Sequence, residues 1–61
     1  MKIEKLQIAI DESRRFIRNA EAAKKRLKED QYAGFSGSKE TAAAKRASLD
    51  LTRALADLRK S

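Results

Sequence analysis

The sequence predicts an all-α protein, an antiparallel two-helix hairpin that associates with a second copy into a dimeric, four-helix-type bundle. Apolar residues recur on steps of three and four over two long stretches, as is typical of amphipathic helices. The chain has no proline, and its two glycines lie close together between these stretches. Its 61 residues form at most one domain, and one hairpin of this size needs disulfides, a metal or association to be stable. The chain has no cysteine or histidine, which favours association.

The first predicted helix spans residues 2–31. Its apolar positions follow a heptad pattern in which Ser13 and Lys24 fill two gaps. The apolar members are Ile3, Leu6, Ile10, Ile17, Ala20 and Leu27, and Ala9, Phe16 and Ala23 widen the pattern on one side. At about 1.5 Å per residue, this uninterrupted helix would be about 45 Å long.

A turn is predicted at residues 32–38, which contain both glycines. Gly34 suits the left-handed position after a helix end, and Ser38 is a suitable N-cap for a second helix. That second helix is predicted over residues 39–60, which are rich in alanine and leucine. The residues expected to face the first helix are Ala44, Ala47, Leu51, Ala54, Leu55 and Leu58.

Pairing the helices about this turn leaves the beginning of the first helix without a partner. Ser13 would lie near Leu58, so the second helix would end about two and a half turns short of the beginning of the first helix. Contiguous exposed aliphatic side chains usually mark an interface, so we expect another molecule to cover this overhang. A lone exposed leucine such as Leu49 is also normal on a protein surface. The predicted protein interface comprises Ile3, Leu6, Ile8 and Ile10 as apolar anchors, Arg14, Arg15 and Arg18 as charged contacts, and Leu49 from a weaker second stripe.

The charge of the chain favours an anionic partner. Fifteen Lys and Arg against nine Asp and Glu give a formal net charge of +6. The densest basic cluster consists of Lys24, Lys25, Arg26 and Lys28. It has two interpretations: it binds phosphate groups of a nucleic acid or nucleotide, or it stabilises the C-terminal end of the helix electrostatically. The second is favoured, because Tyr32 and Phe35 are well placed to close the end of the hairpin and no known nucleic-acid-binding motif is present.

No catalytic, cofactor or metal site is predicted. Without Cys and His, the common nucleophile–base pairs and zinc ligands are missing. Neighbouring carboxylates such as Asp11 and Glu12 diverge by about 100° on a helix, so they do not converge on one substrate. No stretch resembles a signal peptide or is apolar enough to span a bilayer. We therefore expect a non-enzymatic, cytoplasmic protein without a membrane partner.

Residues 43–59, AAKRASLDLTRALADLR, resemble the C-terminal helix of small helical accessory proteins of temperate bacteriophages. The resemblance implies a protein that binds and blocks a host protein in the host-cell cytoplasm. The leading functional prediction is therefore a phage-like modulator or inhibitor that acts by protein–protein interaction. The alternative is nucleic-acid or anionic nucleotide binding by a basic helical-hairpin dimer.

Overall fold

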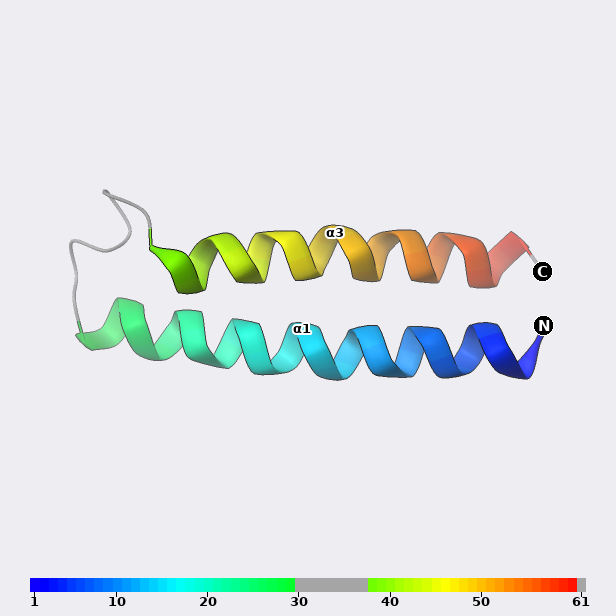
Figure 1. Cartoon of the computed structure of the whole chain (residues 1–61), viewed down its shortest axis with the longest axis horizontal. Helices are drawn as coiled ribbons and strands as arrows, with labels where there is room; N and C mark the ends of the chain where they lie inside the picture. Colours follow the sequence, from blue (N-terminus) through cyan, green and yellow to red (C-terminus); the bar gives the residue numbers. More distant parts are fainter. Residues whose placement is uncertain (30–37, 61) are drawn as a thin grey trace.

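The part of the chain that the structure describes forms two antiparallel α-helices that pack side by side (Figure 1). The computed structural model describes residues 1–29 and 38–60. Helix α1 spans Ile3–Glu29 and helix α3 spans Lys39–Lys60, and the described residues contain no strand. The predicted all-α hairpin of two packed helices is confirmed. Of the predicted turn at 32–38, only residue 38 is described, and residues 30 and 31 of the predicted first helix also lie outside the described residues.

Helix α3 begins with a reciprocal capping arrangement at Ser38. The backbone N–H of Thr41 donates to Ser38 Oγ at 3.1 Å, and the backbone N–H of Ser38 donates to Thr41 Oγ1 at 3.0 Å. Each side chain thereby satisfies a backbone donor that the first turn of a helix leaves without a partner. The predicted N-cap is confirmed, with Thr41 as its second member.

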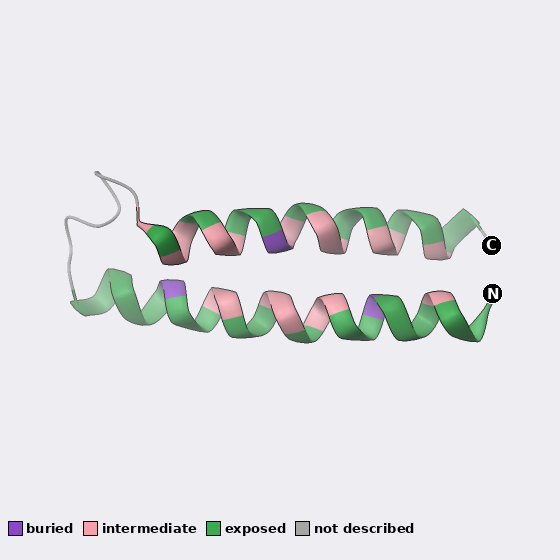
Figure 2. Cartoon of the chain, viewed as in Figure 1, coloured by how far each residue is buried: buried purple, intermediate pink, exposed green. Residues whose placement is uncertain are grey.

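The side of α3 that was predicted to face α1 does so. Ala47 is fully buried at 0% exposure, and the other members of the predicted set are half-buried (Figure 2). These are Ala44, Leu51, Ala54, Leu55 and Leu58. A fully buried alanine at the middle of this set indicates that the two helix backbones approach closely, because a larger residue would hold them apart.

The side of α1 that packs against α3 differs from the prediction. Ala9 and Ala23 are buried and Phe16 between them is half-buried, whereas Ile10 and Ile17 are exposed. The residues at the edge of the predicted stripe therefore form the contact, and Leu27, expected to fill it, is exposed as well. Ala9, Phe16 and Ala23 follow one another at a seven-residue spacing, so the side of α1 that meets α3 carries a large side chain between two small ones.

The predicted N-terminal overhang is wrong. Lys5 Nζ donates to Asp57 Oδ1 at 3.4 Å, so α3 extends alongside the first turn of α1. The longer helix instead projects at its other end, where the last turn of α1 reaches past the beginning of α3 (Figure 1). The prediction placed the facing helix ends level at the turn, whereas Lys5 lies beside Asp57 and Arg15 beside Asp50. The seam and the ion pairs between the helices set the register instead.

Candidate functional site

An apolar stripe runs along α1 beside the helix–helix seam. We define the apolar stripe as Ile3, Leu6, Ile10 and Ile17, all of which are exposed. They follow one another at intervals of three, four and seven residues, so they lie on one side of the helix. Each is rotated away from the buried alanines of the seam, and this rotation, not an overhang, leaves them exposed.

Two leucines of α3 continue this apolar surface. Leu51 and Leu55 follow Ala47 by four and eight residues, which rotates them about 40° and 80° to one side of it. Asp50, which bonds to α1 at the seam, lies about 60° to the other side. Both leucines are only half-buried. The apolar stripe together with Leu51 and Leu55 is called the apolar face below.

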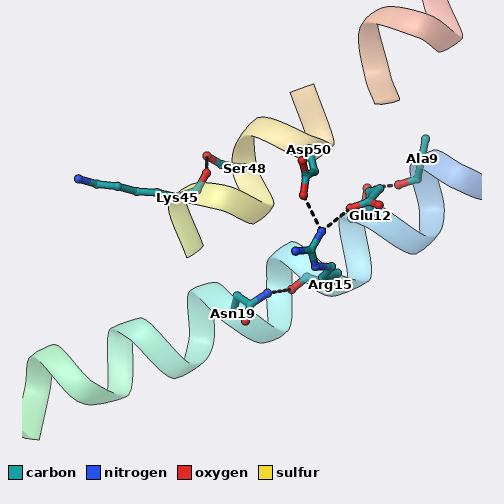
Figure 3. A network of polar contacts seen from close by, with 8 residues as sticks. Ala9, Glu12, Arg15, Asn19, Lys45, Ser48 and Asp50 are labelled. Carbon is teal, nitrogen blue, oxygen red and sulfur yellow. Dashed lines mark hydrogen bonds and ion pairs between the residues drawn. The ribbon is translucent and has the colours of Figure 1, made fainter. Parts of the chain in front are cut away.

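The opposite side of the seam carries a polar network centred on Arg15 (Figure 3). Arg15 Nη1 donates to Asp50 Oδ2 of α3 at 2.7 Å and to Glu12 Oε2 of its own helix at 3.2 Å. The backbone carbonyl of Arg15 accepts a hydrogen bond from Asn19 Nδ2 at 3.0 Å. The hydrogen bonds to Asp50 and then Glu12 raise the pKa of Arg15 above its ordinary value, so the guanidinium stays charged. With the Lys5–Asp57 pair, this network fixes the register of the two helices.

Two surface depressions lie along this polar side. The first, the acidic depression, is lined by Ile8, Glu12, Asp50, Arg53, Ala54 and Asp57. The second, the basic cleft, is lined by Arg15, Asn19, Lys39, Ala42, Ala43 and Arg46. The two share the Arg15–Asp50 contact as their boundary, so opposite charges are segregated along one side of the hairpin.

The structure separates the predicted interface residues into distinct surfaces. Ile3, Leu6 and Ile10 belong to the apolar stripe, whereas Ile8 lines the acidic depression on the opposite side of α1. Leu49 is exposed on α3, two positions beyond Ala47 and hence about 200° away from the seam.

The predicted arginines are likewise separated. Arg14 and Arg18 are exposed and line a shallow depression with Asp11 and Ile17, next to the apolar stripe. Arg15 instead takes part in the interhelical ion pair, so its role in this structure is to hold the hairpin together. It was predicted to be a surface contact because its partner Asp50 is distant in sequence.

The predicted basic cluster lies on the last two turns of α1. Lys24, Lys25, Arg26 and Lys28 are all exposed. At about 100° per residue, Lys24, Lys25 and Lys28 share one side of the helix and Arg26 points away from them, and none of the four lines the basic cleft. The basic cleft draws Lys39 and Arg46 from α3 and Asn19 from α1, and none of these was predicted as a site residue. Only the register between the helices brings them together.

Within residues 1–29 and 38–60, no group of three or more acidic side chains is placed to hold a metal ion. Neither of the two described helices has a segment long and apolar enough to cross a membrane. Comparison with protein-family models, curated protein sequences and solved structures finds no significant match to this chain.

Proposed function

We propose that this chain is a small, non-enzymatic binding protein that forms a two-fold homodimer through its apolar face and acts by protein–protein interaction. The exposed apolar stripe is the observation that carries the proposal. Isoleucine and leucine side chains outside the hairpin seam stabilise the folded protein through their burial only when another molecule covers them. In a two-fold dimer the same residue is covered in both copies, so a short chain can build an interface from few apolar residues.

The exposed surface area supports association. A folded monomeric protein of 6.9 kDa exposes about 4,000 Å². This chain exposes 4948 Å². The excess of about 950 Å² is close to the ~800 Å² that each partner buries in a standard protein interface. In the described residues only Ala9, Ala23 and Ala47 are buried, so the hairpin alone has a very small core.

A further protein partner is the second part of the proposal. Arg14 and Arg18 are exposed beside the apolar stripe and are available to an acidic surface. The resemblance of residues 43–59 to phage accessory proteins extends the proposal to a host protein in the cytoplasm, which the contact would modulate or inhibit.

A matched pair of isoleucines tests the self-association. Ile17 in the apolar stripe is 53% exposed, and Ile8 on the opposite side of the same helix is 52% exposed. Complete burial of an isoleucine contributes up to about 3 kcal/mol, so covering Ile17 contributes about 1.5 kcal/mol per copy and about 3 kcal/mol per dimer. We expect Ile17→Ser to weaken dimerisation about 100-fold in sedimentation equilibrium.

Ile8→Ser serves as the control, because it removes the same side chain at the same exposure from the acidic depression. It should change the dimerisation constant less than about threefold. Circular dichroism should show that both variants keep the helix content of the wild type. A wild-type chain that stays monomeric at high concentration, or equal weakening by both variants, contradicts the proposal.

Nucleic-acid binding through the basic cluster is the second candidate function. The observation in its favour is that Lys24, Lys25 and Lys28 are exposed near the C-terminal end of α1, so a long polyanion has access to them. Binding through several phosphate contacts should weaken log-linearly as the salt concentration rises. Binding to an RNA or DNA oligonucleotide that is absent, or insensitive to salt, rules this function out.

A further inference from the structure

The basic cleft is a surface depression that side chains of both helices line. It has a volume of about 400 Å³. Helix α1 contributes Arg15 and Asn19, and helix α3 contributes Lys39 and Arg46. Ala42 and Ala43 also line it, and their short side chains leave space between the longer polar ones.

The donors of the cleft are available to a ligand. In the described part of the chain, Lys39 and Arg46 form neither hydrogen bonds through their side chains nor ion pairs. Arg15 makes both of its side-chain contacts through Nη1, so its Nη2 and Nε donors have no partner among the described residues. Asn19 uses Nδ2 to donate to a backbone carbonyl, and its carbonyl oxygen accepts no described hydrogen bond.

The cleft collects positive charge from Lys39 and Arg46, whereas Arg15 is already paired with Asp50 and Glu12. Three cationic side chains line it, and no Asp or Glu is among its described lining residues. The acidic depression beside it has three carboxylates and one arginine. Asp50, the carboxylate nearest to the boundary, is bonded to Arg15 Nη1. A multiply charged anion therefore suits the cleft better than a single carboxylate does.

We propose that the basic cleft binds a phosphate group. Guanidinium groups donate paired hydrogen bonds to phosphate oxygens, and lysine adds a point charge. Arg46 and Lys39 supply these from α3, and the free donors of Arg15 supply them from α1. Arg15 is held in place by Asp50 and Glu12, which reduces the entropy cost of binding. This inference goes beyond the proposed protein-binding function, because the cleft lies across the seam from the apolar face and stays open in a dimer formed through that face.

Titration of the ¹⁵N-labelled full chain with inorganic phosphate, followed by NMR, tests the proposal. We expect saturable shifts at the backbone amides of Ala42 and Ala43 and at the side-chain amide of Asn19. Sodium acetate at the same ionic strength should give no saturable shift at these positions. Saturation by acetate at the same concentrations, or phosphate shifts confined to other residues, overturns the proposal.

Two arginine variants with equal net charge separate the cleft from general attraction by a basic protein. Arg46→Ala should weaken phosphate binding about tenfold, because it removes a charge-assisted contact. Arg53→Ala, in the acidic depression of the same helix, should weaken it less than about twofold. Equal effects of the two variants overturn the proposal. Sedimentation of Arg46→Ala should show unchanged self-association. A failure of the phosphate proposal can therefore be distinguished from a failure of the dimer proposal.

The source of the phosphate group is identified by two further probes, a mononucleotide and a single-stranded oligonucleotide. Both should show the same dependence on Arg46 as inorganic phosphate does. Tighter binding of the oligonucleotide would identify the nucleic-acid backbone as the source, whereas equal binding per phosphate would identify a small phosphoester. If Arg46→Ala binds both probes as tightly as the wild type does, the assignment of the phosphate site to the cleft is wrong.

Discussion

Replacing Ala47 by leucine tests whether the close helix seam governs the stability of the hairpin. Ala47 has no exposed surface, and leucine adds three carbon atoms to it. If the seam had room, burying these atoms would stabilise the protein by about 0.8 kcal/mol each, or about 2.4 kcal/mol in total. Because the register of the helices places Ala47 level with the half-buried Phe16 of α1, we expect overpacking, which costs about 2 kcal/mol. The two outcomes differ in sign.

The assay is urea and thermal denaturation followed by circular dichroism at one fixed protein concentration, since the proposed self-association would make apparent stability depend on concentration. Ala56→Leu is the matched control. Ala56 is exposed on the same helix, and alanine and leucine are both strong helix formers. The control should change stability by less than about 0.5 kcal/mol. Ala47→Leu should lower the Tm by about 10 °C. A Tm above that of the wild type would refute the close seam.

Two further predictions concern the register and the helix start. Asp50→Ala should destabilise the hairpin more than Asp57→Ala in urea denaturation, because the 2.7 Å contact of Asp50 with Arg15 is shorter and less exposed than the 3.4 Å contact of Asp57. High salt should reduce this difference, and equal effects of the two variants would contradict the assigned role of Asp50. Ser38→Ala should cost about 1 kcal/mol of stability, because the N–H of Thr41 loses its acceptor. An unchanged urea midpoint for this variant would argue against the capping arrangement.

The elements of this fold follow from local features of the sequence. The absence of proline and the three-and-four spacing predict both helices, and Ser38 identifies the start of the second. The inward side of α3 is predictable as well, because most of its large apolar residues lie in one stripe with Ala47 and only Leu49 lies outside it. In each case, a few residues close together in the chain determine the outcome.

The packing of α1 could not be predicted in this way. Its isoleucine and alanine positions are adjacent on the helix surface, and hydrophobicity alone favours the isoleucines as the buried side. Close approach of the backbones favours the alanines instead, and this depends on what α3 presents to them. The register is equally non-local, since the contacts of Lys5 with Asp57 and of Arg15 with Asp50 link residues far apart in sequence. The basic cleft depends on that register.

The division of α1 into an alanine side and an isoleucine side connects folding to binding. A seam of small side chains lets the helices approach closely, but it buries little apolar area, so the hairpin gains limited stability from its own core. The larger apolar side chains, Ile10 and Ile17 among them, are left for a second molecule. A partner that covers them stabilises the folded hairpin by mass action, and the polar side with its basic cleft remains in solvent. The apolar stripe is thus left out of the seam, whereas Arg15 on the polar side both joins the helices and lines the basic cleft.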